Sequence, residues 1–194
     1  MIGNRIQKIA IVGGTFDPIH LGHLKIITEV AKKFEKVIVI PTGEPWLKAT
    51  KPIATGEQRV AMAQTAVNSL DLADQVVVSA IEVKRAGPSY AIDTVTALQQ
   101  IYPDASFTLV LGSDAARILH KWHRSDELQK LVEVLVVKRA SVPASEFPEI
   151  QIDAPEISST EIRDKVAHSQ EITDLVIPTI ATFIKEHQLY GSQR

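Results

Sequence analysis

The sequence predicts an α/β fold built on a mostly parallel sheet, and three observations support this. Six short runs rich in Val and Ile recur along the chain, at residues 9–12, 37–40, 76–79, 107–111, 134–137 and, more weakly, 149–152. Most of these runs are continuously apolar, which is typical of strands buried on both faces. Segments with helical spacing lie between them. Strands that alternate with helices are joined by right-handed crossovers, so we expect a doubly wound sheet.

Each predicted helix carries one apolar face. These faces comprise Leu24, Ile27, Ala31 and Phe34 in the first helix, Val60, Ala63, Val67 and Leu70 in the second, and Ile92, Val95, Leu98 and Ile101 in the third. After an irregular, proline-containing stretch at 139–157, we expect a short helix at 159–166 and a last one that begins at Pro178. We expect one domain over residues 1–194, with the segment from about 158 to 194 forming either a small helical subdomain or a cap on the sheet.

Composition narrows the possible functions. The 194 residues are 45% apolar and 23% charged, as in globular enzymes, and they include no cysteine, which excludes thiolate metal sites, thiol catalysis and a disulfide scaffold. The net charge of −2 gives no reason to expect sequence-independent binding to nucleic acid or to a membrane surface. Residues 1–10 lack a long apolar run, and no stretch reaches the ~18 to 20 apolar residues of a membrane span. We therefore expect a soluble, cytoplasmic protein.

Candidate ligand-binding residues follow the predicted strands, because open α/β sheets bind ligands beyond the carboxyl ends of their strands. GGTFDPIHLGH follows the first run at residues 13–23, GSD follows the fourth at 112–114, and ISSTEIR occupies 157–163. The first motif is neither GxGxxG nor GxxxxGKS, so a dinucleotide fingerprint and a P-loop both lose their main support. Glycine, hydroxyl, imidazole and cationic groups are thus expected at one rim of the sheet.

Two histidines of the first motif indicate a phosphate site. His20 and His23 are three residues apart at a predicted helix start, so their rings should project toward a common side. The paired Gly13 and Gly14 let the backbone approach a ligand closely, and N–H groups at a helix start bind phosphate. Either ring alone could instead be a structural cap or a core residue. A third interpretation makes Asp17 and both histidines the metal ligands of a hydrolase, although Pro18 interrupts the register and no HExxH motif is present.

Further candidates lie later in the chain. Ser158 and Glu161 fit a capping box, while Ser159, Thr160 and Arg163 would bring hydroxyls and a guanidinium to the same helix start, a combination suited to phosphate. Trp122 lies in HKWHR at 120–124, among cationic or potentially cationic side chains. Lys48 and Arg59 could face the ligand, but solvation is the commoner role of a lone basic residue.

These motifs resemble those of bacterial nicotinate-nucleotide adenylyltransferases, which belong to the HxGH nucleotidyltransferase superfamily. The signature at 13–23 resembles their GGTFDPIHxGH, and 157–163 resembles their ISSTxIR. Between them GPSY at 87–90, IDT at 92–94, YP at 102–103 and GSD at 112–114 follow the family in order, and the similarity runs from about residue 9 to residue 190. The resemblance implies a Rossmann-like fold and transfer of AMP from ATP, with Mg²⁺ carried by its phosphates, to nicotinate mononucleotide. The products would be deamido-NAD and pyrophosphate, on the route to NAD.

The resemblance also implies roles for individual residues. His20, His23 and Arg163 would be catalytic and would bind the ATP phosphates. The rest of the implied ATP site is Gly13, Gly14, Thr15, Phe16, Gly112, Asp114, Ser159 and Thr160, with Gly112 and Asp114 meeting a ribose. The implied acceptor site is Lys48, Tyr90, Ala91, Trp122 and His123, with Trp122 stacked on the pyridine ring. Ala91, His123 and the pair Trp46 and Leu47 depart from the family pattern, all in the acceptor region.

Two further expectations concern activity. The cationic groups around Trp122 predict a preference for nicotinate over nicotinamide mononucleotide of at least ~10²-fold, because an anionic ring substituent suits a positive potential. A non-catalytic nucleotide-binding module remains an alternative, since binding and transfer use the same phosphate contacts.

Overall fold

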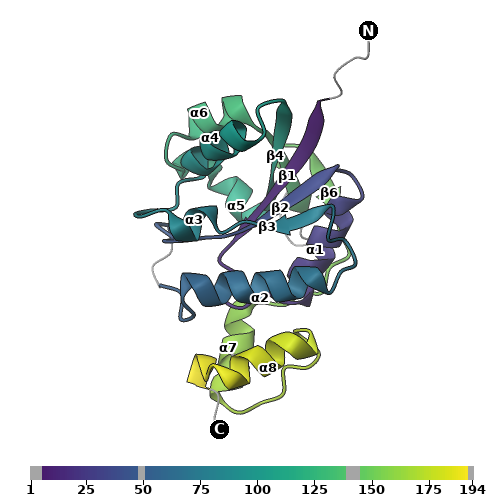
Figure 1. The fold of residues 1–194 in the computed structure, drawn as a ribbon, viewed down its shortest axis with the longest axis vertical. Helices are drawn as coiled ribbons and strands as arrows, with labels where there is room; N and C mark the ends of the chain where they lie inside the picture. The colour runs from purple at the N-terminus through teal and green to yellow at the C-terminus, as the bar shows by residue number, and fades with distance from the viewer. Residues whose placement is uncertain (1–5, 48–50, 139–144, 192–194) are drawn as a thin grey trace.

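The sheet of the computed structural model is entirely parallel and organises the molecule (Figure 1). The structure describes residues 6–47, 51–138 and 145–191. Within these ranges the strands are ordered β3 (Val76–Val78), β2 (Lys36–Pro41), β1 (Gln7–Gly14), β4 (Ala105–Gly112), β5 (Glu133–Lys138) and β6 (Glu149–Gln151). All six predicted strands are present. The order reverses between β1 and β4, so the ends of these two strands flank the place where a doubly wound sheet binds its ligand.

Two apolar cores cover the two faces of the sheet. Successive residues of β1 alternate between them: Ala10 and Val12 belong to one core, Ile9 and Ile11 to the other. The first core is covered by α1 (Leu21–Ala31), α2 (Gly56–Asn68), α7 (Ser159–Ala167) and α8 (Pro178–Glu186). The second is covered by α4 (Ala91–Ile101), α5 (Ser113–Arg117) and α6 (Ser125–Leu131). Burial on both faces explains why the strands are continuously apolar in sequence.

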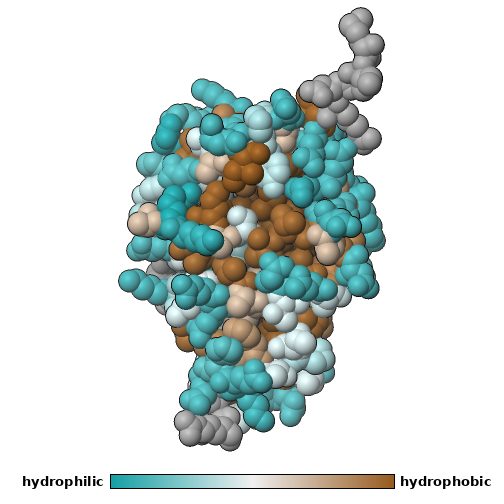
Figure 2. Space-filling model, viewed as in Figure 1, coloured by the Kyte–Doolittle hydropathy of each residue, from teal (hydrophilic) through white to brown (hydrophobic). Residues whose placement is uncertain are grey.

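Short elements complete the chain. They are α3 (Ile81–Lys84) and the 3-10 turns η1 (Leu119–Lys121) and η2 (Leu189–Gly191). Figure 2 shows apolar side chains gathered in the middle of the face on which Figure 1 places the β3 edge. In the described part of the chain, none of the helices is both long and apolar enough to cross a membrane.

The helices agree with the sequence pattern except at their ends. Helix α1 begins at Leu21, three residues before the first apolar position of the pattern, because His20 caps it there. It ends at Ala31, so Phe34 lies outside it, contrary to the prediction. Pro178 begins α8 as predicted, and Ser158 caps α7 by accepting the Glu161 N–H.

The C-terminal segment packs on the first core rather than forming a core of its own. Ile162 of α7 and Ile180 and Ile184 of α8 are buried in the same cluster as Ala10 and Met62. This continuity supports the cap interpretation over a separate subdomain.

Candidate active site

The end of β1 opens onto a cavity of about 280 Å³. Gly13, Gly14 and Thr15 line one side of it, and Gly112, at the end of β4, lines another. A Cβ placed on Gly13 or Gly112 would meet no atom within 4 Å, so both positions leave room for a ligand beside the backbone. Phe16 follows with a φ of 51° and is 2% exposed. Its side chain is therefore part of the core, and only its backbone is available to the ATP site implied by the resemblance.

His20 and His23 cap the start of α1 reciprocally. The His23 backbone N–H donates to His20 Nδ1, and the His20 backbone N–H donates to His23 Nδ1, both at 3.3 Å. The two rings stack with centroids 3.6 Å apart, and the Phe16 ring meets His23 edge-on at 5.0 Å. The expectation of rings on a common side is confirmed, and the structural interpretation of each ring as a cap is also correct.

The caps fix the tautomer of both rings. A nitrogen that accepts a hydrogen bond carries no proton, so in each neutral imidazole the proton is on Nε2. Each neutral ring therefore carries its N–H donor on Nε2. Two such donors at a helix N-terminus, where the helix dipole is positive, are suited to phosphate oxygens.

Helix α7 is attached to the same turn. Ser159 Oγ donates to the Pro18 carbonyl at 2.9 Å, and Arg163 Nη1 donates to the Asp17 carbonyl at 2.8 Å. The second terminal nitrogen of Arg163 donates to the hydroxyl of exposed Thr160 at 3.1 Å. The two helix starts, more than 130 residues apart in sequence, are thus held side by side with the guanidinium between them.

Asp17 is a structural junction between distant segments. It is 4% exposed; Oδ2 accepts the Ile53 N–H, while Oδ1 accepts the Ala54 N–H and the Tyr190 hydroxyl. Burial, followed by the adjacent Asp17 charge, raises the pKa of the Tyr190 phenol. Among the described residues, no three His, Cys, Asp or Glu side chains are grouped to hold a metal ion. The geometry therefore gives the hydrolase interpretation no support.

Arg59 also has a structural role, which the sequence did not predict. We expected solvation, but this residue is 1% exposed and donates to the carbonyls of Thr15, Gly43 and Ala54. Burial lowers the pKa of its guanidinium, with the Asp17 charge opposing that shift. Arg59 thereby joins the loops that follow β1 and β2.

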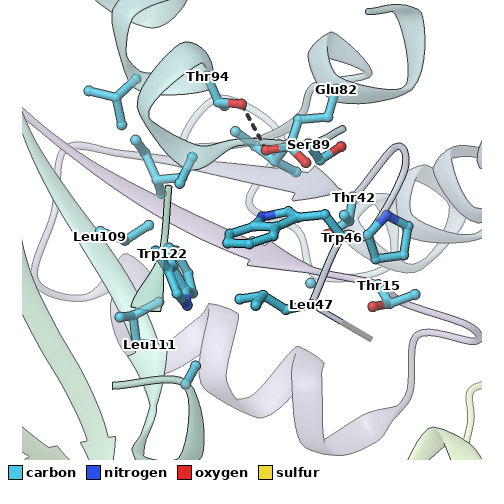
Figure 3. Close-up of a pocket in the computed structure, with 18 of the residues that line it drawn as sticks. Thr15, Thr42, Trp46, Leu47, Glu82, Ser89, Thr94, Leu109, Leu111 and Trp122 are labelled. Carbon is cyan, nitrogen blue, oxygen red and sulfur yellow. Dashed lines mark hydrogen bonds between the residues drawn. The ribbon is translucent and has the colours of Figure 1, made fainter. Parts of the chain in front are cut away.

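The far side of the cavity contains the residues expected to meet the acceptor. Trp122, His123 and Ala91 line it, and so do Trp46 and Leu47 (Figure 3). Tyr90 stacks on His123 with ring centroids 4.0 Å apart, so it supports a lining residue. Trp122 Nε1 is buried and makes no hydrogen bond within the described structure.

The charge near Trp122 differs from the expectation. Arg124 is paired with Glu127 at 2.6 Å, which offsets much of its charge. A carboxylate, that of Glu82, also lines the cavity and accepts a hydrogen bond from Thr94 Oγ1 at 2.8 Å. The positive potential expected around Trp122 is therefore reduced by these two carboxylates.

Two expected site residues remain, Asp114 and Lys48. Asp114 is exposed in the first turn of α5, two residues after Gly112. Lys48 lies outside the described residues.

This arrangement defines the class of protein. The family model described as cytidylyltransferase-like matches residues 11–165, the stretch that carries both helix starts. Solved structures of Plasmodium falciparum nicotinic acid mononucleotide adenylyltransferase, complexed with APC and with NaAD, superpose with TM-scores of 0.81 and 0.82 at 19% and 20% identity. Each covers 96% of this chain and 98% of the other. The fold is thus the α/β fold of nucleotidyltransferases, as predicted.

Curated relatives narrow the class to one family. A probable nicotinate-nucleotide adenylyltransferase of Lactiplantibacillus plantarum is 36% identical over 95% of this chain and 88% of its own length. Another, from Oceanobacillus iheyensis, is 35% identical over 97% of this chain and all of its own. The chain belongs to the nicotinate-nucleotide adenylyltransferase family, and so it is a nucleotidyltransferase.

Proposed function

We propose that this protein transfers AMP from ATP to nicotinate mononucleotide, forming deamido-NAD and pyrophosphate in NAD biosynthesis. The observation that carries the proposal is the reciprocal cap of His20 and His23, which orients two N–H donors at the start of α1. Ser159 and Arg163, attached to the same turn, add a hydroxyl and a cation beside them.

The reaction needs placement and charge stabilisation more than proton transfer. The acceptor phosphate has a second pKa near 6, so it is already an anionic nucleophile at neutral pH. One of its oxygens forms a bond to the α-phosphorus of ATP while the bond from that phosphorus to the bridging oxygen breaks, and pyrophosphate leaves with the electron pair. His20, His23 and Arg163 are proposed to hold the phosphates in line and to stabilise the charge that grows on pyrophosphate.

A divalent cation accompanies ATP in nucleotidyltransferases generally, and we propose Mg²⁺ here. The hydrogen-bond donors around the turn are N–H groups, hydroxyls and a guanidinium, which are suited to phosphate oxygens. That set fits an ion bound by the triphosphate and water. Bound there, Mg²⁺ would screen the charge of the phosphates.

Pyrophosphate release from ATP with a panel of acceptors tests the proposal. We expect turnover with nicotinate mononucleotide, and at least ~10²-fold lower kcat/KM with nicotinamide mononucleotide if backbone N–H groups meet the ring carboxylate. Pantetheine phosphate and flavin mononucleotide should give none. Binding of ATP without pyrophosphate release from any acceptor would favour a non-catalytic nucleotide-binding module.

A further inference from the structure

Both tryptophans of this chain line the same cavity. The sequence contains two, Trp46 and Trp122, and they reach the cavity from the loop after β2 and the segment after η1. Trp46 is 39% exposed, and its neighbour Leu47, which also lines the cavity, is 44% exposed. Large apolar side chains exposed at a cavity wall offer surface that a bound ring would cover.

The orientation of Trp46 is set by neighbouring rings. Its indole meets Tyr90 edge-on, with centroids 5.3 Å apart and planes at 72°. Tyr90 in turn stacks on His123, the residue after Trp122 in the chain. Figure 3 shows the two indoles, labelled, on different walls of the same hollow. Ring contacts therefore connect Trp46, through Tyr90, to His123, which follows Trp122 in the chain.

Among its described lining residues, the same cavity contains one acidic group. Glu82 is held by the hydroxyl of Thr94, which also accepts a hydrogen bond from Arg85 Nη2 at 3.1 Å. Apart from this carboxylate the lining is largely apolar or aromatic. Indole faces attract cations through their negative face, more strongly than the rings of Tyr or Phe, and a carboxylate favours the same sign of charge. The cavity is thus complementary to a flat ring that carries positive charge.

We propose that Trp46 is a specificity-determining residue which, together with Trp122 and Glu82, selects an acceptor whose ring is an N-substituted pyridinium cation. This inference rests on the proposed function, in which the acceptor is such a mononucleotide. It assigns recognition of the ring's charge to Trp46, separately from recognition of its carboxylate.

Steady-state kinetics test the position of Trp46. Base-to-aromatic contacts are worth about 1 to 3 kcal/mol, so Trp46→Leu should raise KM for nicotinate mononucleotide by roughly 5-fold to 150-fold and change KM for ATP by less than about 2-fold. Trp46→Phe should restore most of the affinity. Ile101→Ala, which removes an exposed apolar side chain away from the cavity, is the control. A change in KM confined to ATP, or no change at all, would overturn the inference.

A neutral analogue tests the selection for charge. The 1,4-dihydro form of nicotinate mononucleotide has the same substituents but no positive charge on its ring. Calorimetry should show that the wild type binds the pyridinium form more tightly, and that Trp46→Leu reduces this preference by about 2-fold to 30-fold. Equal reduction of affinity for both forms would show that Trp46 contributes only surface, and would overturn charge selection.

Intrinsic fluorescence separates this inference from the proposed function. In Trp122→Phe, Trp46 is the only indole, and its emission should change saturably with nicotinate mononucleotide but not with ATP alone. A response to ATP alone, or none to the mononucleotide, would overturn the role of Trp46 even in an enzyme that releases pyrophosphate normally. If the wild type released no pyrophosphate with any acceptor, a response of Trp46 to the mononucleotide would reject the proposed function and still support the inference.

Discussion

His20 and His23 use different ring nitrogens for the fold and for the proposed reaction. Nδ1 of each ring accepts a backbone N–H at the start of α1, and this leaves the proton on Nε2 as a donor. A substitution can therefore preserve one role and remove the other. Asn at a helix N-cap accepts the same backbone N–H as His20 Nδ1 but does not reach as far.

We expect His20→Ala and His23→Ala each to lower kcat by on the order of 10²-fold or more, because donors to a developing charge act mainly in the transition state. His20→Ala should also destabilise the protein by about 1 kcal/mol through loss of the cap, whereas His20→Asn should lose the same kcat at nearly native stability. Parallel measurements of turnover and of urea-induced unfolding check this. Near-normal turnover in both alanine variants would contradict the phosphate site, as would activity that falls only as the protein unfolds.

Arg163 is expected to contribute mainly to the use of ATP. Its Nη1 donates a hydrogen bond to the Asp17 carbonyl, and this bond holds the guanidinium against the turn that contains both histidines. Arg163→Ala should weaken the binding of ATP by ~1.5 to 3 kcal/mol, as expected for loss of a charge-assisted hydrogen bond, and should affect binding of the acceptor less. Arg117→Ala, which removes an exposed arginine of α5, is the matched control. Normal KM for ATP combined with loss of acceptor binding would assign Arg163 to the other substrate.

At the scale of elements, Asp17 joins three segments that are distant in sequence. Its carboxylate binds the N–H groups of Ile53 and Ala54 before α2 and the hydroxyl of Tyr190 in η2, while its carbonyl binds Arg163 of α7. The last turn of the described chain is thereby attached to the turn between β1 and α1. Stability of the C-terminal segment and geometry of the β1 to α1 turn should be linked through this residue.

Tyr190→Phe tests that link through its pH dependence. The folded-state pKa of the phenol is raised above the unfolded value of about 10, so its contribution to stability is complete below pH ~10 and is lost as the pH rises further. At pH 8 the variant should be less stable than the wild type by about 1 to 3 kcal/mol, and the difference should narrow above pH 10. Denaturant unfolding between pH 8 and 11 measures this, with Tyr102→Phe as the control. A difference independent of pH would mean that the hydrogen bond to Asp17 does not hold in solution.

The strands and helix faces could be predicted because each depends on local pattern. The alternation of Ala10 and Val12 with Ile9 and Ile11 between two cores leaves a continuous apolar run, which the sequence displays directly. The start of α1 beside His20 was predicted, but its end was not: the helix stops at Ala31, so Phe34, which continued the apolar pattern, lies outside it. Pairing the two motifs at one rim was predictable from strand ends alone.

Long-range hydrogen bonds could not be predicted from the sequence. Arg59 binds the carbonyl of Thr15 across 44 residues, and Tyr190 binds Asp17 across 173. A basic side chain whose partners are backbone carbonyls leaves no complementary charge in the sequence to indicate its burial. Arg124 and Glu127 are only three residues apart in the sequence, but only the structure shows that they form an ion pair, which offsets part of the positive charge near Trp122.

On the scale of the whole molecule, one apolar cluster spans both ends of the chain. Ala10 and Val39 of the central strands, Met62 of α2, and Ile162 and Ile184 of the C-terminal helices are all buried within it. A cluster shared in this way should make the C-terminal cap and the sheet lose structure together. We therefore infer a single folding unit over the domain expected from the sequence.

Ile162→Ala tests cooperativity because the substitution and the reporters lie in different parts of the chain. Ile162 is fully buried in α7, in the C-terminal segment. Both tryptophans, Trp46 and Trp122, instead line the cavity and precede that segment in the sequence. Removing the buried side chain should cost about 2 to 5 kcal/mol, and tryptophan fluorescence and far-UV circular dichroism should report the same lowered midpoint. Gln170→Ala, at an exposed position just after α7, should leave both midpoints unchanged. If the cap unfolded independently, the dichroism transition would split and the tryptophan midpoint would stay at its wild-type value, because the sheet and its cavity would remain folded.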